Sequence, residues 1–150
     1  MEKKRKIIPP VHLLISLVLM WLMQNYLPLI QLINPPFAYG GIIAVFCGIA
    51  ISAISAGMFK KADTGIRPFD EATALVTSGF YRYTRNPMYL GMFLVLFGMA
   101  FLQGSLGALL PLPLFVLIIR NHFVLGEERF MEAAFGQSYL DYKSTVRRWI

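Results

Sequence analysis

The stretch best suited to chemistry is a polar, aromatic and cationic run that leads directly into an uncharged segment. Leu75–Gly91 reads LVTSGFYRYTRNPMYLG, and after Pro87 no charged residue occurs until Arg120. Asn86 followed by Pro87 predicts a helix start, because asparagine is favoured just before the first turn and proline within it. The amide groups of a first helical turn lack partners within the helix and attract carboxylates and phosphates. The stretch is therefore either an anion-binding site or an interfacial anchor of tyrosines and arginines.

A second group of polar residues follows the last hydrophobic run. Near its end lie Arg120, Asn121 and His122, and Glu127 and Glu128 come soon after. Adjacent acids can be a solvated helix start, where the helix dipole favours them, or they can bind a cation or accept a proton. The sequence contains no nucleophile-elbow motif, no phosphate-binding loop motif and no zinc-ligand spacing.

The composition is that of an integral membrane protein. Hydrophobic residues make up 57% and charged residues 15% of the chain, against about 45–50% and about 25% in soluble domains. Basic loops of a membrane protein explain the net charge of +6, so we expect no nucleic-acid partner. The single cysteine, Cys47, excludes a disulfide framework, and no metal is expected.

The start, MEKKRK, resembles that of a signal peptide. The apolar run after it is long and lacks a cleavage site, so we interpret this run as a retained span.

Four uncharged segments predict four transmembrane helices within one domain, residues 1–150. A helix needs about 20 apolar residues to cross a bilayer. We therefore expect an all-α integral membrane fold with a long polar loop, residues 60–86, and a C-terminal amphipathic helical segment, residues 127–150. The predicted spans are residues 11–33, 37–59, 87–103 and 108–125, with turns at residues 34–36 and 104–107.

Prolines, glycines and other small residues refine these boundaries. Pro28 predicts that the first span kinks or ends nearby. Gly126 predicts the end of the fourth span, and Gly136 predicts a break in the C-terminal segment. A row of small residues in the second span predicts that another helix approaches it closely. The row consists of Ala44, Gly48, Ser52 and Ala56.

The distribution of charge predicts one working face. With four spans, the N-terminal tail, the long loop and the C-terminal segment share one side of the membrane, and the turns on the other side are uncharged. Segments rich in lysine and arginine stay in the cytoplasm. Both termini and the active site are therefore predicted to be cytoplasmic, in a prokaryotic inner or plasma membrane. Because the third and fourth spans form a tight hairpin, we expect Asn86, Tyr89, Arg120 and Glu127 to converge there.

Two blocks of the sequence together resemble a known family. The run LVTSGFYRYTRNPMYLG, followed after a hydrophobic hairpin by EERFMEAAFGQSYLDYKSTV, is similar to the isoprenylcysteine carboxyl methyltransferase family and its bacterial relatives. These are related in turn to phospholipid N-methyltransferases. The resemblance extends from Ala74 to Val146. The first two spans resemble those of the family only in being apolar. It implies a membrane enzyme that uses S-adenosylmethionine to methylate a lipidic or amphiphilic acceptor.

The resemblance also implies roles for individual residues. Asn86 stands where the family's His-Pro-x-Tyr cofactor motif has histidine, and Glu127 matches the glutamate that holds the cofactor. Phe123 occupies the position of a substrate-side arginine, for which Arg120 is the expected substitute. Glu128 is the expected proton acceptor if the methyl acceptor is an amine. The implied cofactor-binding residues are Ala74, Leu75, Val76, Tyr81, Asn86, Pro87, Met88, Tyr89 and Glu127, and the catalytic candidates are Arg120 and Glu128.

Other function classes stay open. A small four-span transporter usually holds an ionisable residue near the middle of the membrane, and here none lies deeper than Arg120. A non-catalytic scaffold could use the small-residue row. Within the methyltransferases, a phospholipid amine N-methyltransferase is the alternative. The sequence identifies neither the methyl acceptor nor the oligomeric state.

Overall fold

The computed structural model describes residues 8–64 and 72–150. Within these ranges the chain is helical and has no strand, apart from an isolated bridge between Gln31 and Ser105. Parts of the predicted basic tail and of the predicted loop 60–86 lie outside the described residues. In chain order the elements are α1 (Pro9–Tyr26), η1 (Phe37–Tyr39), α2 (Gly40–Lys61), η2 (Gly79–Arg82), α3 (Pro87–Gln103), α4 (Leu106–Leu109), α5 (Pro111–Ile119), the π-helical turn η3 (Arg120–Val124), α6 (Leu125–Phe135) and α7 (Gln137–Thr145).

Among the described residues, two stretches of helix are long and apolar enough to cross a membrane. They are Phe37–Lys61 and Leu106–Phe135, whereas Pro87–Gln103 is shorter. Only 11% of the most apolar stretch within Phe37–Lys61 is buried. Large side chains such as Ile43 and Phe46 are exposed. A core helix of a soluble protein would be mostly buried, so this outward apolar face supports a membrane protein. Four spans and their orientation stay predictions.

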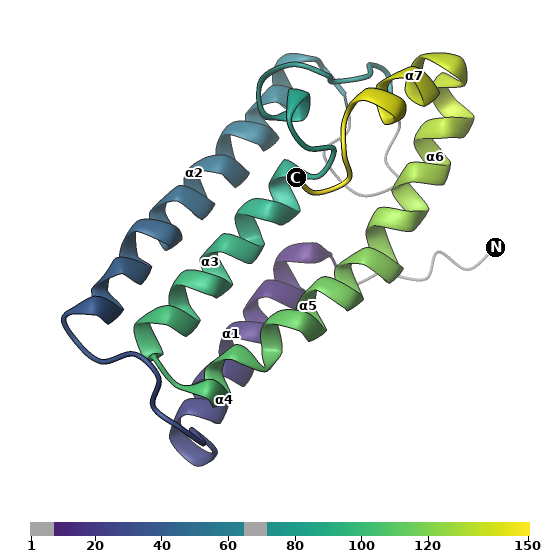
Figure 1. The fold of residues 1–150 in the computed structure, drawn as a ribbon. Coiled ribbons are helices and arrows are strands. Elements are labelled where there is room, and N and C mark those ends of the chain that lie inside the picture. The colour runs from purple at the N-terminus through teal and green to yellow at the C-terminus, as the bar shows by residue number, and fades with distance from the viewer. Residues whose placement is uncertain (1–7, 65–71) are drawn as a thin grey trace.

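Helix α3 lies at the centre of the bundle. Figure 1 shows α2 running along one side of α3, with α5 and α1 on the other side. The buried core lies on this second side, where Met20 of α1, Leu96 of α3, and Phe115 and Ile119 of α5 are almost completely buried. Helix α3, which follows Asn86 and begins at Pro87, is therefore packed against other helices on both sides.

Glycines allow α2 and α3 to approach closely. A Cβ built at Gly48 would lie 2.5 Å from the carbonyl oxygen of Gly91, and one at Gly41 would lie 2.3 Å from a backbone oxygen of α3. Ser52 also donates a hydrogen bond from Oγ to the carbonyl of Met88 at 3.1 Å. The close helix packing expected of the small-residue row is therefore found at Gly48 and Ser52.

The first span is shorter than predicted, since α1 ends at Tyr26 and residues 27–33 are not helical. Pro28 has no amide hydrogen and disfavours a helical conformation in the residue before it. Residues 27–33 instead pair with the turn after α3 through backbone hydrogen bonds, two of which are accepted by the carbonyl of Gly104. These bonds give partners to several backbone groups of residues 27–33, which have none within a helix.

The last long helix does not end at Gly126 as predicted. It continues from α5 through the π turn into α6 and reaches Phe135. A glycine commonly ends a helix by adopting a left-handed conformation, and Gly126 does not adopt one, whereas Gly136 has φ 53° and separates α6 from α7 as predicted. Glu127 and Glu128 therefore lie inside a continuous helix and not at a solvated helix start.

Candidate active site

The start of α3 lies beside the C-terminal end of the chain (Figure 1). Helix α3 begins at Pro87 as predicted, with Asn86 at the preceding position. The Asn86 side chain makes no capping hydrogen bond to the helix, and its Nδ2 donates to the carbonyl oxygen of Arg148 at 2.9 Å. The amide groups of the first turn therefore have no side-chain cap and can receive an anionic group.

Tyr89 and Glu127 form a polar contact between α3 and α6. The Tyr89 hydroxyl donates to Oε1 of Glu127 at 2.7 Å. The Tyr89 side chain is buried, and its ring centroid lies 6.5 Å from that of Phe123. Within the described chain, Oε2 of Glu127 makes no hydrogen bond and no ion pair. A half-buried carboxylate with one free oxygen is suited to hold a cationic group, because the interaction is stronger in a low-dielectric surrounding.

Tyr81 places an aromatic ring near this pair. Its ring packs edge-to-face on Phe59, with centroids 5.3 Å apart, and its carbonyl accepts a hydrogen bond from the Tyr142 hydroxyl at 2.7 Å. The Tyr81 hydroxyl is buried and has no partner in the part of the chain that the structure describes. Burial raises the pKa of Tyr81, and charge on Tyr142 and Glu127 raises it further. The hydroxyl is therefore neutral at physiological pH.

The predicted apolar contacts come from an irregular segment before η2. Val76 is buried, and Ala74 and Leu75 are half-buried. The hydroxyl of Thr64, just after α2, accepts hydrogen bonds from the amides of Thr73 at 3.0 Å and Ala74 at 3.4 Å. These bonds hold the segment against the end of α2.

Glu128 forms ion pairs with two arginines. Arg148 donates from Nε to Oε1 at 2.8 Å and from Nη2 to Oε2 at 2.9 Å. Nη1 of Arg85 lies 3.4 Å from Oε1. The Glu128 side chain is buried, and a buried carboxylate needs such partners to stay charged. Because arginines contact both oxygens and favour the charged form, Glu128 is a weaker proton acceptor than a free carboxylate would be.

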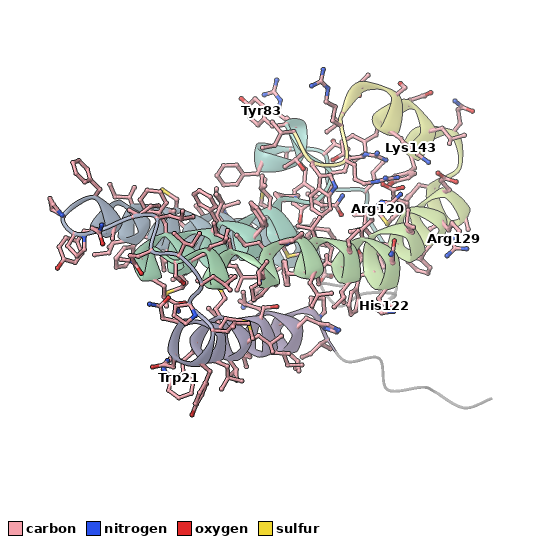
Figure 2. The ribbon with its side chains drawn as sticks, turned by 60° about the horizontal axis from the view of Figure 1, so that its bottom comes forward. Trp21, Tyr83, Arg120, His122, Arg129 and Lys143 are labelled. Atoms are coloured by element: carbon pink, nitrogen blue, oxygen red, sulfur yellow. The ribbon has the colours of Figure 1, made fainter. Side chains whose placement is uncertain are left out.

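The side chain of Arg120 takes no part in the contact between Tyr89 and Glu127. Its side chain is exposed, and its Nη1 donates to Oδ1 of Asn121 at 3.2 Å. Figure 2 shows Arg120 at the end of the molecule opposite Trp21. The chain between Arg120 and Glu127 passes through the π turn, which holds more residues per turn than an α-helix. Two residues seven positions apart therefore no longer share one helix face, and the convergence expected of Arg120 is not observed.

Two apolar cavities meet at Tyr89. The larger, of about 510 Å³, lies between α1, α2 and α3 and is lined by residues that include Leu13, Ala56, Met88 and Tyr89. The smaller, of about 200 Å³, lies between α3 and α5 and is lined by Tyr89 and Trp149, among others. The site therefore has an apolar side within the bundle and a polar side at the loop and the C-terminal segment.

The polar side fits the functional groups of S-adenosylmethionine. Glu127 offers a free carboxylate oxygen for an ammonium, and the first turn of α3 offers amide donors for a carboxylate. Within the described residues, the Tyr81 hydroxyl and both Nε and Nη1 of Arg85 are buried without a hydrogen-bond partner. Buried polar atoms almost always have a partner, so we expect ordered water or a polar ligand beside them.

Several contacts at the site were not anticipated from the sequence. Arg85 was recognised as part of a cationic run, but its pairing with Glu128 was not predicted. Thr84, Arg148 and Trp149 were assigned no role, although the Thr84 hydroxyl donates to the Arg148 carbonyl at 3.1 Å. No spacing rule connects Thr84 with Arg148, since they are 64 positions apart in the chain.

Comparisons with known proteins show the family to which the chain belongs. A family described as phospholipid methyltransferase matches residues 37–138. The Schizosaccharomyces pombe protein named Protein-S-isoprenylcysteine O-methyltransferase is 28% identical over 126 residues, which cover 75% of this chain and 52% of that protein. An uncharacterized protein of Haemophilus influenzae is 36% identical over 63 residues, which cover 42% of this chain and 100% of that protein. No solved structure matches the chain significantly.

Proposed function

Because the chain belongs to the phospholipid methyltransferase family, we propose that it is an integral membrane methyltransferase that uses S-adenosylmethionine to methylate a lipid-like acceptor. The observation that carries the proposal is the hydrogen bond from Tyr89 to Glu127. It joins the last residue of the motif at the start of α3 to the acid that the family resemblance assigns to the cofactor. A non-catalytic scaffold would not need a half-buried acid with a free oxygen at this place.

In the proposed complex, Glu127 binds the ammonium of S-adenosylmethionine through its free oxygen, and Tyr89 holds the other oxygen in place. The first turn of α3, from Pro87, receives the carboxylate of the cofactor. Tyr81 and Val76 provide a flat and an apolar surface for adenine. The cofactor supplies a methyl group that its sulfonium has already activated. The residues of the chain therefore have to align the acceptor and exclude water.

The state of Glu128 favours a carboxylate as the acceptor. A carboxylate is methylated without losing a proton, so it needs no general base. An amine must lose a proton, and Glu128, the predicted base, is occupied by Arg148 and Arg85. We therefore favour a lipid-linked carboxylate, such as that of an isoprenylcysteine, over a phospholipid amine as the methyl acceptor.

The acceptor chain is proposed to occupy the larger cavity between α1, α2 and α3. Its volume of about 510 Å³ lies within the range of small-molecule sites, about 300–1,000 Å³. Met88 and Tyr89 line it next to the proposed cofactor site, so an apolar tail there would bring its head group to the methyl donor.

The end of the molecule that carries the site is proposed to face the cytoplasm. Lys60 and Lys61 end α2 there, and Lys143 lies at the same end in α7 (Figure 2). Lysine-rich ends of transmembrane helices stay on the cytoplasmic side. Cysteine-accessibility labelling at Lys143→Cys, from outside intact cells, would contradict this orientation if it succeeded.

Methyl transfer from radiolabelled S-adenosylmethionine tests the function. Purified protein in lipid nanodiscs would be incubated with a farnesylated cysteine, which offers a carboxylate, or with phosphatidylethanolamine, which offers an amine. We expect labelled product with the first acceptor, and release of the label by mild base would identify a methyl ester. Lack of transfer to either acceptor, together with no binding of S-adenosylhomocysteine in titration calorimetry, would overturn the proposal.

Filling the larger cavity should separate acceptor binding from cofactor binding. Ala56→Phe is expected to raise KM for the lipid acceptor by about tenfold or more, since it occupies space that an apolar chain would use. The Kd of S-adenosylhomocysteine should not change. Ala50→Phe, on the exposed face of the same helix, is the matched control and should leave KM unchanged. Equal KM values for both variants would exclude this cavity as the acceptor site.

A further inference from the structure

The last five residues, Val146–Ile150, run back from α7 to the start of α3, and we call them the C-terminal strap. Figure 1 shows the end of the chain next to the first turn of α3. The Arg85 amide donates to the Arg147 carbonyl at 3.0 Å. The Arg148 carbonyl accepts from the Thr84 hydroxyl at 3.1 Å and from Nδ2 of Asn86 at 2.9 Å. The backbone of the strap is therefore bonded to the three residues that precede α3.

The side chain of Arg148 connects the strap to α6. Its guanidinium forms a two-point contact with the buried carboxylate of Glu128, at 2.8 and 2.9 Å. Planar contacts of this kind fix orientation as well as distance. Glu128 is the residue next to Glu127, so the contact restrains the backbone that carries the proposed ammonium ligand. Arg148 therefore holds α6 with its side chain and the start of α3 with its carbonyl.

Trp149 makes a third connection. It packs against the buried core and, together with Tyr89, Leu90 and Phe115, lines the smaller cavity between α3 and α5. Tyr89 is the residue whose hydroxyl holds Glu127. The strap thus bonds to Asn86 through the Arg148 carbonyl and to the neighbour of Glu127 through the Arg148 side chain, and its Trp149 lines a cavity together with Tyr89.

We propose that the C-terminal strap sets the distance between the start of α3 and Glu127, and that Arg148 is the positioning residue of the methyl-transfer site. This inference rests on the proposed function. Asn86 then acts on the cofactor in part by anchoring the strap, because one of its two side-chain N–H groups donates to the Arg148 carbonyl. The strap lies beyond residues 37–138, which match the family, so the match by itself does not assign it a role.

A strap that only stabilised the fold would behave differently. Removing it would lower the melting temperature, but folded protein would bind the cofactor as before. A positioning strap alters ligand affinity and turnover in protein that is still folded, since a displacement of about 1 Å at a reacting group can cost about 100-fold in rate. Affinity and stability must therefore be measured on the same variants.

The first experiment compares Arg148→Ala and Arg148→Lys with Arg147→Ala in nanodiscs. Arg147 is exposed and contributes only its carbonyl among the described contacts, so its alanine variant is the matched control. We expect Arg148→Ala to weaken S-adenosylhomocysteine binding and lower kcat by about 10- to 100-fold. Arg148→Lys keeps the charge but cannot reproduce the planar two-point contact, so it should retain the wild-type melting temperature more closely while still losing affinity.

The second experiment follows the strap directly by fluorescence. The chain has two tryptophans, and Trp21 lies on α1 at the opposite end of the molecule (Figure 2). In a Trp21→Phe background, Trp149 reports on the strap alone. We expect its emission to change on titration with S-adenosylhomocysteine, with the same Kd as calorimetry gives. This measurement does not depend on whether Arg148→Ala folds.

The outcomes distinguish this inference from the proposed function. If the wild type binds no S-adenosylhomocysteine, the proposed function fails. If the wild type binds it and Arg148→Lys binds it equally well, with unchanged kcat and no response of Trp149, the strap is structural only and this inference is overturned. A loss of affinity in both Arg148 variants, with Arg147→Ala unchanged and a saturable Trp149 response, establishes the strap as part of the site.

Discussion

Glu127→Gln is expected to weaken S-adenosylhomocysteine binding by about 10- to 100-fold and to reduce methyl transfer at least as much. Glutamine has the same shape and can still accept the hydrogen bond from Tyr89, so the contact at 2.7 Å should survive. What is lost is the negative charge that faces the ammonium of the ligand, and a hydrogen bond to a charged group contributes about 1.5–3 kcal/mol. Isothermal titration calorimetry of the purified variant measures the change in Kd.

Two further variants show whether the effect belongs to the site. Glu132→Gln lies on the same helix and removes an acid whose partner is Lys143 at the surface. Surface ion pairs contribute little, so this variant should bind the ligand as the wild type does. Tyr89→Phe keeps the charge of Glu127 and should have a smaller effect than Glu127→Gln. If Glu127→Gln and Glu132→Gln had equal affinities, Glu127 would not be the ammonium ligand.

Gly48→Leu is expected to prevent the close packing of α2 on α3 and to lower the melting temperature by about 10 °C or more. The first side-chain atom added at Gly48 would lie 2.5 Å from the carbonyl oxygen of Gly91. A backbone oxygen cannot move aside as a flexible side chain can, so the helices must separate. Thermal unfolding in detergent, followed by size-exclusion chromatography, measures the loss of folded protein.

The same helix provides a control for this substitution. A Cβ built at Gly57 has no neighbour within 4 Å among the described residues, and leucine is a better helix former than glycine. Gly57→Leu should therefore keep the melting temperature of the wild type or raise it slightly. If both variants lost the same amount of stability, the close approach of α2 and α3 at Gly48 would not be what holds these helices together.

The packing of α3 connects these two predictions. Its first turn belongs to the proposed cofactor site, while its middle is held by α2 through glycines and by α5 through the buried core. A loosened α2–α3 interface would therefore also disturb Tyr89, which faces both cavities. We expect Gly48→Leu protein that remains folded to bind S-adenosylhomocysteine more weakly than the wild type, whereas Glu127→Gln should lose affinity at unchanged stability.

Local signals in the sequence determined the features that depend on a single residue and its own turn. Proline restricts its backbone angle wherever it occurs, so the start of α3 at Pro87 and the end of α1 before Pro28 could be anticipated. Glycine permits a left-handed backbone, so the breaks at Gly104 and Gly136 could be anticipated too. The high apolar content predicted helices that face a membrane, and two of them are long enough to cross it.

Tertiary structure alone decided which distant groups meet. A helix stop at Gly126 was a reasonable expectation, but the backbone there stayed helical, and the π turn before it moved Arg120 away from the face of Glu127. That Tyr89 and Glu127 lie close together was expected from the hairpin of the third and fourth spans, whereas nothing in the spacing pointed to the pairing of Glu128 with Arg148. Such pairings depend on the relative placement of whole helices, which is set by packing throughout the bundle and not by any residue's immediate neighbours in the chain.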